Sequence, residues 1–81
     1  MLNVTVYSKK ECHLCEIAKE ELKAIRCEFD FIIKEVDIEK DTLFYEKFKH
    51  HIPVVEVDGK IISTGRVDRK KLIALLKHQL Q

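Results

Sequence analysis

The spacing Cys12-x-x-Cys15 constrains this chain more than any other feature, because of where the pair lies. Apolar residues alternate with polar ones from Leu2 to Tyr7, before the pair, and the pattern has a helical period from Leu14 onward. Alternation with a period of two is typical of a strand, and apolar spacings of three and four are typical of a helix. The pair therefore falls at a strand-to-helix junction, where free helix amides and the helix dipole stabilise a thiolate. A thiolate attacks disulfides and binds soft metals, so the sequence favours redox exchange or metal binding.

Two starting points fit this first helix. Ser8–Glu11 matches a capping box, which would begin the helix at Lys9 and place Cys12 in its second turn. The apolar stripe begins only at Leu14, which favours a later start with Cys12 at the helix end. We expect the helix to end near Cys27, a small apolar residue with a structural role. Its inward stripe is predicted to be Leu14, Ile17, Ala18, Leu22 and Ile25.

The rest of the chain predicts a second strand, a short helix, a hairpin and a final helix. The second strand falls within Phe29–Ile38, with one face formed by Phe29, Phe31 and Ile33. Asp41 or Thr42 caps the short helix, whose apolar residues are Leu43, Phe44 and Phe48. Asp58-Gly59, between two apolar runs, suits a type I′ hairpin turn that joins Val54–Val57 to Lys60–Ser63. Asp68 caps the final helix, whose inward residues are Leu72, Leu75, Leu76 and Leu80.

This pattern predicts one α/β domain over residues 1–81 with the order β-α-β-α-β-β-α. The first two strands, joined by a helix, should be parallel, and the closing hairpin antiparallel. Helices would then cover both faces of a four-stranded mixed sheet. The cysteine pair would open from the carboxyl edge of that sheet, where α/β proteins commonly bind ligands.

The charge balance and the N-terminal residues restrict the partners and the location that we expect. Charged residues make up 36% of the chain, but both signs are interleaved and the net charge is +1, which argues against nucleic acid and anionic lipid. The N-terminal residues do not match a secretory signal, and no apolar run approaches the roughly 18 residues of a membrane span. We therefore expect a cytoplasmic protein, and nothing in the apolar pattern demands more than a monomer. In a reducing cytosol, three cysteines favour a catalytic or metal-binding pair over a structural framework.

Three motifs together resemble the glutaredoxin family of the thioredoxin fold: Tyr7-Ser8-Lys9, Cys12-His13-Leu14-Cys15 and Ile52-Pro53-Val54. The resemblance extends over Val4–Leu80. Ile52–Val55 and Thr64–Asp68 look most like a branch of small glutaredoxin-like domains. The resemblance implies a thioredoxin-like fold and thiol–disulfide oxidoreductase activity.

The resemblance also implies a role for individual residues. Cys12 matches the exposed nucleophile and Cys15 the buried resolving cysteine, which together form a redox-active disulfide. Lys9 matches a basic residue that contacts the glutathione carboxylate and favours the thiolate. Pro53 matches a cis-proline beside the disulfide, and Ile52 matches the residue whose backbone pairs with substrate.

Four further residues have a less specific reading. A protonated His13 would also stabilise the Cys12 thiolate, so we count it with the substrate-binding residues. His50 and His51 precede Pro53 and are expected to be solvated. Arg66 suits either a contact with an anionic substrate group or a surface position.

The expected partners are a disulfide-containing protein or a small thiol, together with a thiol reductant or a reductase. Classical glutaredoxins carry Gly-Gly and acidic residues where this chain has Ser63–Asp68, so glutathione as co-substrate is an open question. We expect no metal and no bound cofactor. Two alternatives stay open: a metal or iron–sulfur carrier that uses Cys12 from each chain of a dimer, and a binding domain without turnover.

Overall fold

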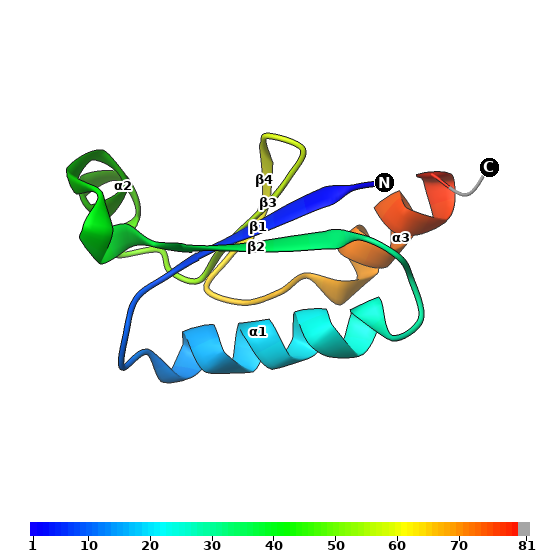
Figure 1. Ribbon diagram of the computed structural model, residues 1–81, viewed down its shortest axis with the longest axis horizontal. Helices are drawn as coiled ribbons and strands as arrows, with labels where there is room; N and C mark the ends of the chain where they lie inside the picture. The colour runs from blue at the N-terminus through cyan, green and yellow to red at the C-terminus, as the bar shows by residue number, and fades with distance from the viewer. Residues whose placement is uncertain (80–81) are drawn as a thin grey trace.

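The strands and helices follow the predicted order, with one added 3₁₀ turn. The computed structural model describes residues 1–79 (Figure 1). The elements are β1 (Asn3–Ser8), α1 (His13–Arg26), β2 (Ile32–Asp37), the 3₁₀ turn η1 (Ile38–Lys40), α2 (Thr42–Phe48), β3 (Val54–Val57), β4 (Lys60–Thr64) and α3 (Arg69–Gln79). Among these residues, none of the helices has the length and apolar character needed to cross a membrane.

The four strands form one mixed sheet in the order β2-β1-β3-β4. Strands β1 and β2 are parallel, as expected for two strands joined by a helix. Strand β3 is antiparallel to both β1 and β4. The predicted mixed sheet is confirmed, and β1 and β3 are its two central strands.

Helices cover both faces of the sheet, as predicted (Figure 1). Alternate side chains of β1 point to opposite faces, so Val4 and Val6 lie in one core and Tyr7 in the other. We call the first core the set that packs α1 and α3 against the sheet, which includes Val4, Val6, Val55, Leu22, Ile25, Leu72 and Leu76. The second core, on the α2 face, consists of Tyr7, Ile38, Phe48 and Val54, with Val36, Phe44 and Ile52 packed against them.

Helix α1 has the later of the two predicted starts. Cys12 is its N-cap, with extended backbone angles, and Cys27 is its C-cap. The capping-box start at Lys9 is therefore wrong. The inward stripe is Cys15, Ala18, Leu22 and Ile25, at spacings of three, four and three.

Part of the predicted stripe of α1 is also wrong. Leu14 is 55% exposed and Ile17 is 39% exposed. Successive residues of a helix are rotated by about 100° around its axis. Because Cys15 points inward, its neighbour Leu14 points away from the sheet. Cys15, not Leu14, begins the buried face.

In the β2 region and in α2, most residues predicted to face the core do so, and one does not. Phe29 and Phe31 lie before β2 begins, yet both pack into the first core with Ile33. Phe44 and Phe48 face the second core, as predicted, whereas Leu43 is 82% exposed because the short α2 presents only one narrow face to the sheet.

In α3 the predicted inward residues Leu72 and Leu76 are buried. Leu75 is 36% exposed, because it lies to the side of the stripe that those two residues define. Leu80, also predicted to face inward, lies outside the described residues.

The hairpin and the helix caps match the sequence prediction. Asp58 and Gly59 both have positive φ angles, 48° and 89°, as a type I′ turn requires. The Asp58 carboxylate accepts a hydrogen bond of 3.0 Å from the backbone N–H of Asn3, which ties the hairpin to the start of β1. Asp41 caps α2 by accepting from two backbone N–H groups, and the Asp68 carboxylate accepts from the Lys71 N–H at the start of α3.

Candidate functional site

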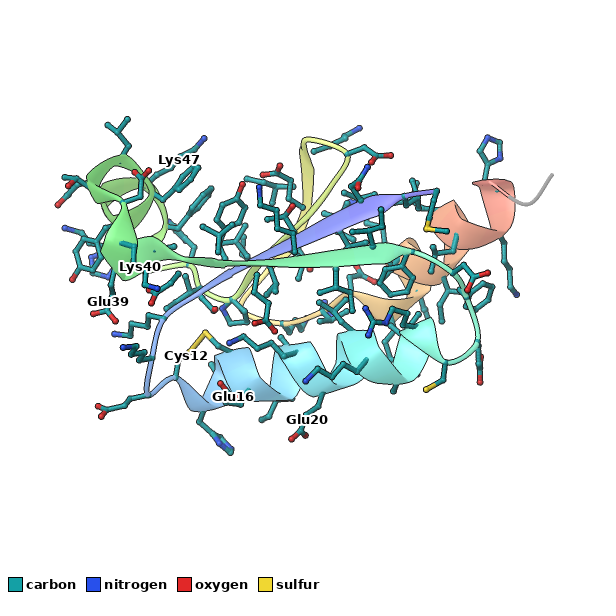
Figure 2. All side chains as sticks on the ribbon, in the orientation of Figure 1. Cys12, Glu16, Glu20, Glu39, Lys40 and Lys47 are labelled. Carbon is teal, nitrogen blue, oxygen red and sulfur yellow. A yellow bond between two sulfur atoms is a disulfide. The ribbon has the colours of Figure 1, made fainter. Side chains whose placement is uncertain are left out.

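Cys12 and Cys15 are joined by a disulfide at the N-terminus of α1, where Figure 2 labels Cys12. The Cys12 Sγ accepts a hydrogen bond of 3.2 Å from the backbone N–H of Cys15. This contact makes the sulfur the N-cap acceptor of the helix, a position usually held by the oxygen of Ser, Thr, Asp or Asn. Cys12 is partly exposed, whereas Cys15 is fully buried. The two sulfurs therefore differ in access to solvent although they belong to one bond.

A tight turn brings the chain from β1 to this helix end. Strand β1 ends at Ser8, and Glu11 has a φ of 55°, in the left-handed region that residues with a Cβ rarely adopt. Such a conformation costs on the order of 1–2 kcal/mol, so the surrounding structure must hold it in place. The turn reverses the chain and leaves Lys9 and Lys10 exposed on the approach to Cys12.

Pro53 lies beside the end of β1 from a distant part of the sequence. Tyr7 pairs with Val54 across β1 and β3, so the residue before Val54 is level with the end of β1. The Ile52–Pro53 peptide bond is cis, Pro53 is buried, and Ile52 packs against the second core.

The loop that contains Pro53 is held by the segment after β4. The Gly65 N–H donates to the carbonyls of His51 and Pro53, at 3.1 and 2.8 Å. Gly65 has a φ of 77°, a conformation in which a Cβ would be strained. Arg66 follows directly and is exposed, as are His50 and His51.

A groove of about 540 Å³ opens beside the turn, at the edge of the sheet where β1 and β2 both end. Four lysines line it: Lys9 and Lys10 from the turn, Lys19 from α1 and Lys40 from η1. Three carboxylates lie among the lysines: Glu35, Asp37 and Asp41. The remaining lining residues are Ser8, Val36 and Phe44. Figure 2 labels Lys40 above the position of Cys12. The groove suits a ligand that carries charges of both signs.

Sequence reasoning placed Lys9 near the site but missed Lys40. The signal was available, because parallel strands joined by a helix end at the same edge of a sheet. Lys40 follows the second strand as Lys9 follows the first, so the two lysines share an edge. Asp41, which the sequence marked only as a cap, lines the same groove.

His13, predicted to bind substrate, and Cys27, predicted to be structural, both lie at the surface. His13 is the first residue of α1 and is exposed. Cys27, at the far end of α1, is a free and exposed thiol. Its expected structural role is therefore wrong, because the C-cap position points it away from the core.

Within residues 1–79, no group of three or more His, Cys, Asp and Glu side chains is placed to hold a metal ion.

The strand that leads to the site carries a perturbed tyrosine. The Tyr7 hydroxyl donates a hydrogen bond of 2.8 Å to the Glu56 carboxylate, across β1 and β3. Burial and, after it, this hydrogen bond and the charge of Glu56 raise the pKa of Tyr7 to about 12. The ring packs against Phe44 and Phe48, with centroids at 5.2 and 4.6 Å. Tyr7 therefore stays neutral and links the sheet to α2.

Comparison with known proteins gives a consistent result. Residues 3–77 match the family model described as "Glutaredoxin-like domain (DUF836)". The glutaredoxin-like protein YDR286C homolog of Dictyostelium discoideum is 36% identical over 77 residues, an alignment that covers 88% of this chain and 71% of that protein.

Solved structures show the same fold. Protein Ne2328 of Nitrosomonas europaea has a TM-score of 0.83 at 21% identity, covering 93% of this chain and 91% of that one. Thioredoxin-2 of the malaria parasite has a TM-score of 0.70 at 21% identity, covering 96% of this chain and 82% of that one. At this level of identity, the likeness establishes a thioredoxin-like fold and nothing about substrates.

Proposed function

This chain belongs to the family of glutaredoxin-like domains (DUF836), and from that premise we propose that it is a dithiol–disulfide oxidoreductase acting through Cys12 and Cys15. A thiol redox role in general follows from the fold, the family and the cysteine pair. One observation supports the specific proposal most strongly: the N-cap sulfur is partly exposed and bonded to a fully buried partner.

The difference in exposure supports a different role for each cysteine. In the reduced protein, the Cys12 thiolate would be stabilised by the Cys15 N–H that its sulfur already contacts and by the positive end of α1. It attacks one sulfur of a target disulfide, forms a mixed disulfide and releases the other target sulfur as a thiolate. That released thiolate takes up a proton from solvent.

Cys15 then completes the exchange. Its thiol loses a proton and attacks the Cys12 sulfur, which reforms the Cys12–Cys15 bond and releases the second target thiolate, which is protonated in turn. Two electrons have passed to the target, and the protein is oxidised. A thiol reductant or a reductase must then reduce the Cys12–Cys15 disulfide, with glutathione as one candidate.

The surroundings of Cys12 supply the proposed substrate contacts. Lys9 and His13 are exposed on either side of it in sequence, and Lys9 lines the groove at the sheet edge. Ile52 and Pro53 precede β3, beside the end of β1, where an extended substrate segment would pair with the backbone of Ile52. The expected substrates are protein disulfides or small-molecule disulfides, handled by a cytoplasmic monomer.

Three single variants test the proposal in an insulin-reduction assay, with either glutathione or a dithiol as reductant. Cys12→Ser should lose activity by orders of magnitude, because it removes the nucleophile. The fold should survive, since serine is itself a favoured N-cap whose oxygen accepts the same amide. Cys15→Ser should accumulate a mixed disulfide on Cys12, visible by mass spectrometry.

Cys27→Ser is the matched control, since it removes the third thiol at an exposed site. It should retain the activity of the unmodified chain. Equal activity of Cys12→Ser and wild type, inactivity of the wild type with both reductants, or adducts found only on Cys27 would each contradict the proposal.

A further inference from the structure

Helix α3 carries a concentration of positive charge that the near-neutral composition hides. Arg69, Lys70, Lys71 and Lys77 are all exposed, and α3 contains no acidic residue. The nearest acid in sequence, Asp68, is engaged as the cap of the helix. None of these four cations forms a salt bridge with a residue in the described range 1–79. Their charge is therefore available to a partner.

Three of these cations, Arg69, Lys70 and Lys77, border an apolar groove. A depression of about 570 Å³ is lined by Arg69, Lys70, Ile73, Ala74 and Lys77, which we call the α3 groove. The spacing of these residues places them on one outward side of the helix. The inward side is occupied by Leu72 and Leu76, which anchor α3 in the first core, with Ile73 packed partly against it. The floor is therefore apolar, and the rim is cationic.

We propose that the α3 groove docks an acidic, amphipathic segment of a partner protein. Such a segment matches both parts of the groove, because its carboxylates face the cationic rim while its apolar side chains cover Ile73 and Ala74. Charge complementarity of this kind speeds association and selects the partner.

Two other classes of partner fit less well. Single-stranded nucleic acid binds through stacking on aromatic rings, and the groove has none. A lipid surface is bound by helices that present large apolar side chains outward, whereas two of the three leucines within Arg69–Gln79, Leu72 and Leu76, are buried and the third, Leu75, is 36% exposed.

The location of the groove makes docking compatible with exchange at Cys12. Figure 2 shows Cys12 and α3 toward opposite ends of the molecule, whose longest dimension is 38 Å. A partner held on α3 leaves the sulfur uncovered while raising the effective concentration of its reactive group near the protein. The proposal does not depend on which disulfide is reduced.

The test uses the full chain and a short fluorescent peptide with Glu and Leu at helical spacing. Binding is followed by anisotropy, and the site by ¹⁵N–¹H NMR shifts. Lys70→Glu/Lys77→Glu should weaken binding about tenfold or more, because each change replaces an attraction with a repulsion. Ala74→Glu, at an exposed position on the groove floor, should weaken it similarly while helix content stays unchanged.

The matched control is Lys34→Glu/Lys60→Glu, which makes the same change in net charge at exposed positions of β2 and β4. It should bind like the wild type, and all four proteins should reduce a small disulfide at the same rate. The proposal is overturned if the control loses affinity equally, if a Lys-for-Glu peptide binds as tightly, or if the shifts spread beyond residues 66–78. It is also overturned if the peptide does not bind, whether the groove stays empty or is occupied instead by a DNA oligonucleotide, anionic vesicles or a second copy of the chain.

Discussion

At the scale of single residues, Tyr7 shows how the two central strands are joined chemically as well as by backbone pairing. Its hydroxyl donates to Glu56 on β3, and its ring contacts both phenylalanines of α2. The hydrogen bond satisfies a polar group that would otherwise be buried without a partner, which costs about 1–3 kcal/mol. Tyr7 therefore stabilises both the pairing of β1 with β3 and the packing of α2 on the sheet.

Tyr7→Phe should reveal this contribution through pH. At neutral pH we expect a loss of about 0.5–1.5 kcal/mol in the free energy of unfolding, because one hydrogen bond is removed. In the wild type, the pKa of Tyr7 lies near 12 in the folded state and near 10 when unfolded. The unfolded state thus releases its proton first, and stability present below pH 10 is lost as the pH rises toward 12.

Chemical denaturation from pH 8 to 12 measures this effect. The stability advantage of the wild type over Tyr7→Phe should fall by on the order of 2 kcal/mol, since two pKa units separate the states, so that Tyr7→Phe becomes the more stable protein near pH 12. The other tyrosine and the lysines are common to both proteins and cancel in the difference. A gap that stays constant over this range would show that Tyr7 is not perturbed.

At the scale of elements, local sequence signals were sufficient to predict the turns and helix caps. They were not sufficient to predict which face of a helix is buried. The Asp58-Gly59 turn and the caps Asp41 and Asp68 were predictable, because each depends on a few neighbouring residues. The rotation of α1 about its own axis was not predictable, because Leu14 and Cys15 are both apolar and periodicity cannot choose between adjacent positions. Leu43 was misassigned for a related reason, since a helix as short as α2 has too few turns to define a face.

Leu22→Ala and Leu14→Ala test the observed phase of α1 with the same chemical change at two positions. Leu22 is fully buried, so its truncation should cost about 2–5 kcal/mol in unfolding free energy. Leu14 is more than half exposed, so the same truncation should change stability by no more than about 0.5 kcal/mol. Urea denaturation of the oxidised proteins compares them. Similar losses for the two variants would mean that the helix is rotated from the position described.

At the scale of the whole molecule, β1 and β3 should be the most stable part. Both are paired on each side, and their residues Val4, Val6, Val54 and Val55 are completely buried. Global stability for a chain of this length should be on the order of 4–12 kcal/mol, at 0.05–0.15 kcal/mol per residue. Amides in the central strands should approach that limit in hydrogen exchange, while α2 and the outer edges of β2 and β4 open more easily.

Native-state hydrogen exchange by NMR checks this expectation. The slowest amides should be those of β1 and β3 that donate within the sheet, with α2 faster because it has only seven residues. Exchange of α2 or β4 as slow as that of β1 would contradict it.

The candidate site, viewed at this scale, was predictable only in part. The cysteine pair and Pro53 carry recognisable local signatures, and the structure places them at one edge of the sheet. The four-lysine groove and the α3 groove have no such signature, because each depends on which surfaces tertiary packing leaves open. The sequence from Arg69 onward does show four cations and no acid, but it does not show which surface they border.

The hydrogen bond from the Cys15 amide to the Cys12 sulfur gives the protein an internal reporter. Any change in the bonding of that sulfur alters the electron density to which this single N–H donates. The chemical shift of the Cys15 amide should therefore distinguish the internally bridged, ionised and partner-linked forms of the chain, so that one resonance could follow turnover without an added dye or label.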